Sequence, residues 1–246
     1  MSTAAPVPSG SGHPGHHGHS GLVIAVDGTS GSGKSSTCRG AASRLGLAYL
    51  DTGAMFRAMT WFMLEHGVDV HDADAVAARA TEPAIVSGTD PLAPTIHVDG
   101  VDVGEAIRTQ RVTDAVSPVS TVPAVRSRLL ELQRAIIAEA VQGPGIVVEG
   151  RDIGSVVAPE APVKLYLTAD PAARAARRAA EQGEQDAAAV AATQASLLDR
   201  DRIDSGRATA PLTMAEGAVH IDTTPYTLEQ VIDRVVALAE AVEATA

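Results

Sequence analysis

Apolar residues in this sequence gather into five short runs, separated by longer stretches in which they recur with the period of a helix. The runs occupy residues 22–26, 47–50, 146–149, 163–167 and 219–222. Short runs with little polar alternation are typical of parallel strands that helices cover on both faces. The pattern therefore predicts an α/β fold with a doubly wound, five-stranded parallel sheet.

Local signals mark the start of three helices. Asp170-Pro171 places an N-cap before a proline at the first helical position, and Thr227 with Gln230 has the spacing of a capping box. Pro123 opens an amphipathic stretch that continues to about Val141. We expect a helix at each of these places.

A long insertion separates the second and third predicted strands. It has almost a hundred residues, too many for a single crossover helix, so it must contain further structure. Residues 96–103 alternate apolar and polar side chains across Asp99-Gly100, which is the strongest short signal for a hairpin. We therefore predict a small β-containing unit within the insertion.

The composition is that of a globular protein. The chain has 246 residues, of which 45% are apolar, and this is ample for a packed interior. No apolar run approaches the roughly 20 residues needed to cross a bilayer, and the N-terminus lacks the order of a secretory signal. We expect a cytoplasmic protein that does not enter a membrane.

Residues 1–21 differ from the rest because they are rich in Gly, Ser, Pro and His and have almost no apolar side chains. Such a segment cannot offset the entropy of ordering, so we predict a flexible tail. Its histidines could bind a stray metal ion, although no other ligands accompany them. Cys38 is the only cysteine, so it forms no internal disulfide, and we expect a reduced, partly buried thiol.

The net charge of −11 argues against a general nucleic-acid binder, because phosphate backbones attract broadly basic surfaces. An anionic substrate must therefore meet a local cationic pocket. Of the 19 basic residues only Lys34 and Lys164 are lysines. Arginine holds phosphate through two parallel hydrogen bonds and stays charged, which suits such a pocket.

The segment from Gly28 to Ser35 matches the phosphate-binding pattern GxxxxGK[ST], between a predicted strand and a predicted helix. Its glycines let backbone N–H groups face a phosphate, Lys34 would reach the β- and γ-phosphates, and Ser35 would ligate Mg²⁺. We therefore predict ATP and Mg²⁺ as cofactors. The candidate ATP-binding residues of this loop are Gly28, Thr29, Ser30, Gly31, Ser32, Gly33, Lys34, Ser35 and Ser36.

The chain contains no asparagine, which excludes the Asn-Lys-x-Asp element that reads guanine in regulatory GTPases. Phosphoryl transfer between two nucleotides brings two polyanions together, and unit charges 4 Å apart near a protein surface repel by roughly 4 kcal/mol. Arg57 and Arg151 follow predicted strands, whose carboxyl ends line the binding crevice of open α/β sheets. Arg200 and Arg207 are further candidates for supplying positive charge.

Four sequence blocks resemble those of the bacterial cytidylate kinases, which are P-loop nucleoside monophosphate kinases. The blocks are LDTGAMFR at 50–57, EAIRTQ at 105–110, VEGRDIG at 148–154, and RD, DS, R and PL within 200–212. The resemblance covers the chain from about residue 22 to the C-terminus. It implies a P-loop NTPase-type fold and in-line transfer of the γ-phosphoryl group of ATP to CMP, and also to dCMP, in pyrimidine metabolism.

The resemblance also implies an acceptor site. Arg57 and Arg151 would hold the acceptor phosphate, and Ser117, Arg126 and Asp152 would contact the cytosine, whose amine and ring acceptors need partners of both kinds. The CMP-binding residues implied in this way are Thr52, Phe56, Arg57, Ser117, Arg126, Arg151, Asp152, Arg200, Asp204 and Arg207.

A lid and an ATP-base contact follow from the same resemblance. Arg200 and Asp204 would bind the acceptor ribose or phosphates, and Arg207 would reach the transferring group or the base. Arg174 or Arg177 would lie against the ATP base. The implied catalytic residues are Lys34, Arg151, Arg200 and Arg207.

The implied organisation is a single kinase domain at residues 22–246 after the tail at 1–21. Phe56 stands where the family often has tyrosine, and Ser155 where threonine is common, but neither change removes a proposed charge. The parts of the domain would be a core at 22–53, 142–173 and 208–246, a monophosphate-binding region at 54–141 with a β insert at about 82–105, and a lid at about 174–207.

Other interpretations stay open at this point. Arg126 could face solvent, Asp152 could be an N-cap, and Asp204 could be a salt-bridge partner of Arg200. The acceptor could be UMP, dCMP or a hydroxyl compound, and a non-catalytic nucleotide-binding module would carry the same loop. We expect small nucleotides as the partners, no nucleic acid, and a monomer.

Overall fold

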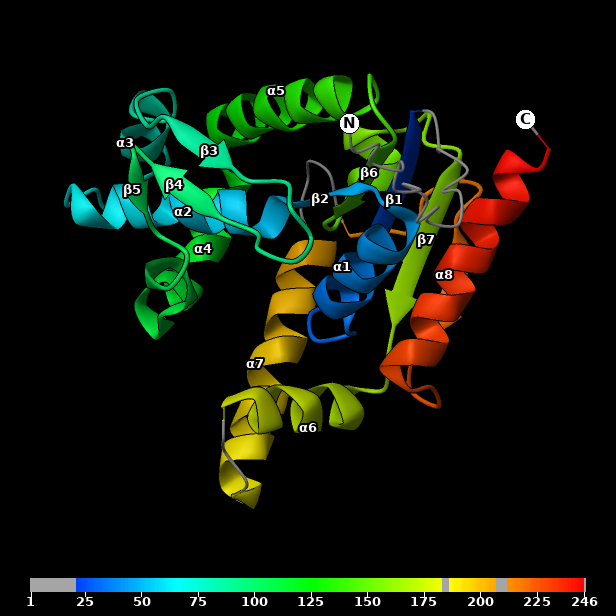
Figure 1. Ribbon diagram of the computed structural model, residues 1–246. Coiled ribbons are helices and arrows are strands. Elements are labelled where there is room, and N and C mark those ends of the chain that lie inside the picture. The colour runs from blue at the N-terminus through cyan, green and yellow to red at the C-terminus, as the bar shows by residue number, and fades with distance from the viewer. Residues whose placement is uncertain (1–20, 183–185, 207–211, 246) are drawn as a thin grey trace, which may run out of the picture.

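The computed structural model describes residues 21–182, 186–206 and 212–245. Its main sheet consists of the five predicted strands, all parallel, in the order β2-β6-β1-β7-β8. The predicted doubly wound α/β fold is therefore confirmed (Figure 1). The strands are β1 (Leu22–Gly28), β2 (Ala48–Asp51), β6 (Gly145–Glu149), β7 (Val163–Thr168) and β8 (Val219–Asp222).

Helices cover both faces of this sheet. On one face α1 (Lys34–Leu45) and α8 (Leu228–Glu243) pack over Ile24 and Val26 of β1, and on the other α2 (Thr52–Glu65) and α5 (Pro123–Ala140) pack over Ala25. Cys38 of α1 is completely buried rather than partly buried, and burial raises the pKa of its thiol. Because both faces are covered, polar groups can gather only at the edges of the sheet.

The insertion between β2 and β6 shares the core of the main sheet instead of forming a separate one. The predicted hairpin is confirmed, since Asp99 and Gly100 have φ of 52° and 81°, the two positive values that a two-residue turn needs. A third strand, β3, pairs with it and was not predicted. The insertion comprises α2, α3 (Ala73–Ala78), β3 (Ile85–Ser87), β4 (Ile96–Val98), β5 (Val101–Asp102), η1 (Ala106–Arg108), α4 (Gln110–Thr121) and α5.

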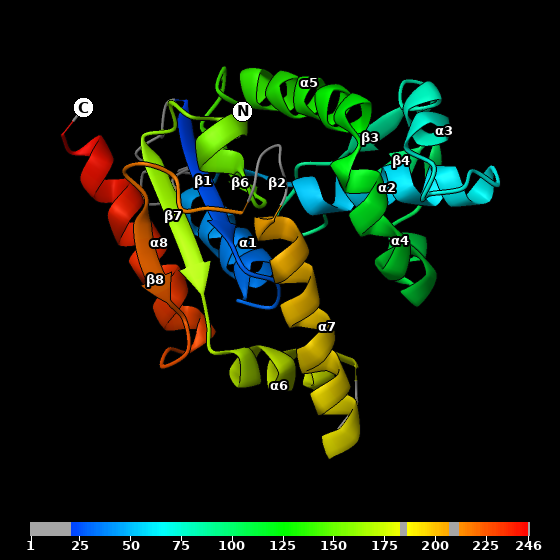
Figure 2. The same ribbon diagram turned by 180° about the vertical axis from the view of Figure 1, so that it is seen from behind.

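Helices α6 (Pro171–Gln182) and α7 (Ala187–Ser205) lie beyond the carboxyl end of β7, and Figure 2 shows the same arrangement from behind. The predicted caps are confirmed, because Asp170 accepts from the N–H of Ala172 at 2.8 Å and Thr227 forms a capping box with Gln230. Among the helices of the described ranges, none is long and apolar enough to cross a membrane.

Candidate functional site

One cleft lies at the carboxyl edge of the sheet and brings together residues of the loop after β1, the insertion and α7. Seven cationic side chains line it against four carboxylates, so the cleft is locally positive although the chain carries a net charge of −11. The predicted site residues that line it are Ser30, Gly31, Gly33, Lys34, Ser35, Ser36, Thr52, Phe56, Arg57, Ser117, Arg126, Arg151, Asp152, Arg177 and Asp204.

The phosphate-binding loop has the predicted context of a strand before it and a helix after it. At Gly28 φ is 145°, and a Cβ atom there would lie 1.9 Å from the carbonyl oxygen of Leu167, so the loop passes β7 only with glycine at this position. Gly33 has φ of 87° and leaves the N-terminus of α1 without a side-chain cap. Uncapped N–H groups at a helix N-terminus favour an anion such as phosphate.

Lys34 is folded back onto its own loop. Its Nζ donates to the carbonyl oxygens of Gly28 at 2.9 Å and Thr29 at 2.7 Å. Burial lowers the pKa of Lys34, and the nearby guanidinium of Arg151 lowers it further. A phosphate in the loop would oppose both effects, because it would add negative charge beside this ammonium group.

Residues of α6 and α7 also hold the phosphate-binding loop through hydrogen bonds. Asp201 on α7 accepts from the N–H of Ser30 at 3.0 Å, and Arg174 on α6 donates to the carbonyl of Ser30 at 2.8 Å and to Asp201 at 2.5 Å. Arg174 is 3% exposed and is not among the residues that line the cleft. Of the two arginines expected beside the ATP base, it therefore supports the loop backbone, while Arg177 does line the cleft.

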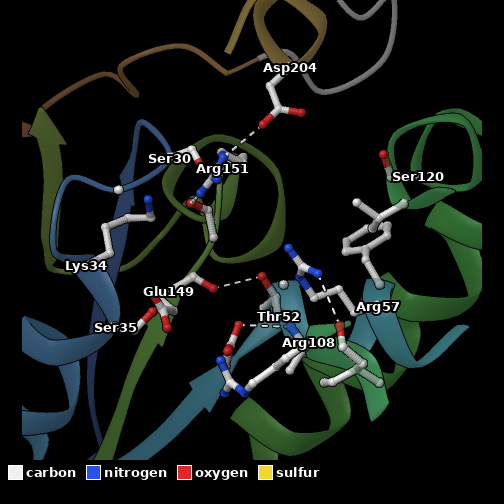
Figure 3. A pocket seen from close by; sticks show the side chains of 18 of the residues that line it. Ser30, Lys34, Ser35, Thr52, Arg57, Arg108, Ser120, Glu149, Arg151 and Asp204 are labelled. Carbon is white, nitrogen blue, oxygen red and sulfur yellow. Dashed lines mark hydrogen bonds and ion pairs between the residues drawn. The ribbon is translucent and has the colours of Figure 1, made fainter. Parts of the chain in front are cut away.

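The first turns of α2 contribute Thr52 and Arg57 to the cleft. The hydroxyl of Thr52 donates to the carbonyl of Glu149 at 2.7 Å, which ties α2 to β6. Nη1 of Arg57 donates to the carbonyl of Ile107 at 3.1 Å and to the hydroxyl of Thr113 at 3.0 Å, so other parts of the insertion hold its guanidinium in place (Figure 3).

Two ion pairs bring the remaining predicted residues together. Arg126 pairs with Asp152 and its guanidinium lies over the Phe56 ring, 5.4 Å from the ring centroid. Arg151 pairs with Asp204 through Nε at 3.0 Å (Figure 3). Arg126 thus faces the cleft and not solvent, and Asp204 pairs with Arg151.

Glu149 is a buried site residue that the sequence analysis missed. It is 3% exposed, its carboxylate accepts a hydrogen bond from the hydroxyl of Tyr49, and it also interacts with Ser35. Burial raises the pKa of Glu149, and the nearby Asp51 raises it further. The sequence did hold a signal for Glu149, because it is the one charged residue in an otherwise apolar strand. The other lining residues that were missed include Asp51, Arg108, Ser120 and Arg178.

Comparison with known proteins places the sequence among enzymes of one kind. A sequence model described as "Cytidylate kinase" matches residues 24–241. The chain belongs to the cytidylate kinase family. The "Cytidylate kinase" of Streptomyces avermitilis is 55% identical over 89% of this chain and 93% of its own length, and that of Streptomyces coelicolor 56% over the same shares. The "Cytidylate kinase" of Corynebacterium efficiens is 46% identical over 90% of this chain and 95% of its own.

Arg207 and the side chain of Arg200 lie outside the described residues. The neighbouring part of α7 is described, and its Asp204 and Leu197 reach the cleft. The prediction of a lid therefore rests on Asp204, on Leu197 and on the resemblance to the family.

We expect the pair between Arg174 and Asp201 to stabilise the fold as a unit. Removing either partner leaves the other charge buried, so Arg174→Gln and Asp201→Asn should each lower the free energy of unfolding. The loss in the double variant should be smaller than the sum of the two single losses. The coupling should be about 1–3 kcal/mol in a double-mutant cycle measured by urea denaturation. Additive effects of the two substitutions would contradict a direct interaction.

Proposed function

We propose that this protein transfers the γ-phosphoryl group of ATP to CMP, giving ADP and CDP, by direct in-line displacement. The observation that carries the proposal is the single cleft that joins the phosphate-binding loop to the acceptor residues Arg57, Arg126 and Arg151. Membership of the cytidylate kinase family, with relatives at 55% identity, supports the same reaction. A dCMP acceptor fits the same set of residues.

The donor nucleotide would bind with its phosphates on the loop from Gly28 to Ser36. Lys34 would leave the carbonyls of Gly28 and Thr29 and turn to the β- and γ-phosphates, where its charge offsets theirs. Arg177 is held by two hydrogen bonds to Thr223 and borders the cleft, which suits a contact with the ATP base.

The residues around Ser35 fit a magnesium ion. Mg²⁺ prefers hard oxygen ligands and is usually bound through one or two protein groups together with substrate phosphates. The hydroxyl of Ser35 and the carboxylate of Glu149 interact with each other, and both border the cleft. Bound there, the ion would neutralise phosphate charge, and these two residues would hold it.

The acceptor phosphate would be held by Arg57 and Arg151 with Thr52 beside them. No general base is needed, because a monophosphate oxygen is already ionised near neutral pH. The arginines hold this oxygen in line with the γ-phosphorus and reduce the repulsion between the two anions, so positioning and electrostatics supply the catalysis. The side chains offered to the cytosine are Ser117, Arg126 and Asp152.

Residues 54–141 would form the region that binds the monophosphate, and residues from about 174 to 207 would act as a lid. Closure of the lid would exclude water that otherwise hydrolyses ATP. The pairing of Arg151 with Asp204 and the brace from Asp201 to Ser30 give this lid contacts to both nucleotide sites. A monomeric state and a cytoplasmic location stay predictions.

A coupled assay of ADP formation tests the function directly. With ATP and Mg²⁺ present, we expect ADP to form rapidly with CMP or dCMP and slowly with UMP or hydroxyl compounds. ATP binding without ADP formation on any acceptor would contradict the proposal and favour a nucleotide-binding module.

Arg126→Ala should weaken the acceptor side alone. Loss of a charged hydrogen bond costs about 1.5–3 kcal/mol, so KM for CMP should rise about 10- to 100-fold with little change in KM for ATP. The matched control is Arg128→Ala, two residues along α5, whose guanidinium pairs with Glu131 at 3.8 Å and does not line the cleft. Equal effects of the two substitutions would argue against a cytosine contact by Arg126.

Arg207→Ala should lower kcat strongly and leave ATP affinity largely intact, because the proposed role of this arginine is to reach the transferring group after closure. Steady-state kinetics combined with calorimetric titration of ATP separates the two quantities. Unchanged turnover in the variant would refute this role.

A further inference from the structure

Asp27 is a buried carboxylate next to the phosphate-binding loop to which nothing above assigns a task. It is the penultimate residue of β1, directly before Gly28, and is 2% exposed. Both of its oxygens accept backbone hydrogen bonds from one distant segment. Oδ1 accepts from the N–H of Ile153 at 2.7 Å, and Oδ2 accepts from the N–H of Gly154 at 2.8 Å.

These two N–H groups begin a short helical turn, η2 (Ile153–Val157), which has no capping side chain of its own. The residue in the N-cap position is Asp152, whose carboxylate pairs with Arg126 instead. N–H groups at the start of a helical turn need an outside acceptor when they are buried. Asp27 supplies it from another strand and leaves Asp152 available to the cleft.

The two bonds lie where β1 and β6 part. The register pairs Val26 with Glu149, and the N–H of Gly150 still donates to the carbonyl of Val26 at 3.0 Å. Beyond this point the chain after β1 becomes the phosphate-binding loop, and the chain after β6 carries Arg151 and Asp152. Asp27 therefore links the two segments one step beyond the end of the regular strand pairing.

We propose that Asp27 is a positioning residue that sets the distance between the phosphate-binding loop and the Arg151–Asp152 segment, and so aligns the acceptor with the donor. This inference rests on the proposed function, because it assumes that the loop holds the donor and that Arg151 and Asp152 hold the acceptor. The role requires a carboxylate. An amide has one oxygen and one NH₂ group, so in an Asn variant one backbone N–H would face another donor.

Keeping this carboxylate ionised disfavours the folded state. Burial raises the pKa of Asp27 from 3.8 to about 6, and the two backbone N–H groups only partly oppose this. A folded-state pKa above the unfolded value contributes stability below about pH 4 that is lost as the pH rises through about 6. The titratable or charged groups around it are Lys34 and Cys38 of α1, Asp152, and Tyr166 of β7, with the Lys164 side chain beside Gly154.

Asp27→Asn in the full-length protein tests the proposal by kinetics. We expect kcat/KM for CMP to fall about 100-fold, the order of loss that a misplacement of about 1 Å produces, while KM for ATP changes little. The control is Asp222→Asn, which alters a carboxylate that accepts from the N–H of Thr224 at 2.9 Å at the end of β8, outside the cleft. The control should keep both constants.

A purely structural role would give a different result. In that case Asp27→Asn would lower the free energy of unfolding at neutral pH and keep wild-type kinetics at 25 °C, or it would weaken the binding of ATP and of CMP equally. Either result would overturn the proposal. Whatever the kinetics, the raised pKa of Asp27 should make the wild type lose stability relative to the variant between about pH 4 and pH 6 in urea denaturation. A pH-independent difference between about pH 4 and pH 6 would contradict a raised pKa of Asp27 in the folded protein.

Amide hydrogen exchange separates this inference from the proposed function. The N–H groups of Ile153 and Gly154 should exchange faster in Asp27→Asn than in the wild type, whatever reaction the enzyme catalyses. If the wild type forms no ADP with CMP, the proposed function fails while this measurement still tests the link. Unchanged exchange at both amides would overturn the positioning role even in an active CMP kinase.

Discussion

Repulsion between two polyanions is the constraint on which the rest of this structure depends. ATP and a nucleoside monophosphate meet only where positive charge offsets part of their own, and the protein as a whole has a net charge of −11. Its cleft solves this locally, with seven cationic side chains against four carboxylates at one edge of the sheet. The open α/β fold makes this possible, because loops after neighbouring parallel strands converge at the same edge.

Three of the cleft cations are engaged with protein groups. Arg126 pairs with Asp152, Arg151 pairs with Asp204, and Lys34 donates to carbonyl oxygens of its own loop. An unpaired buried charge would cost several kcal/mol, so these partners stabilise the fold around the cleft. When nucleotides bind, the cations would exchange these protein acceptors for phosphate oxygens. The acidic residues of the cleft therefore serve as partners of the basic ones.

Much of the fold was predictable because its signals are local. The five strands, the Asp99-Gly100 hairpin and the phosphate-binding loop each depend on neighbours within a few residues. Contacts between distant segments were not predictable. In the run Arg174, Arg177 and Arg178 nothing local indicates that Arg174 turns inward, because its partners Ser30 and Asp201 lie 144 and 27 residues away. Asp27 was missed for the same reason, because its partners Ile153 and Gly154 lie 126 and 127 residues away.

The most direct test of the account is a crystal structure with CMP and a non-hydrolysable ATP analogue bound together. We predict that the guanidinium groups of Arg57, Arg126 and Arg151 converge on the acceptor while the loop from Gly28 to Ser36 encloses the donor phosphates. Guanidinium groups that point to bulk solvent, with the two nucleotides bound apart, would contradict it.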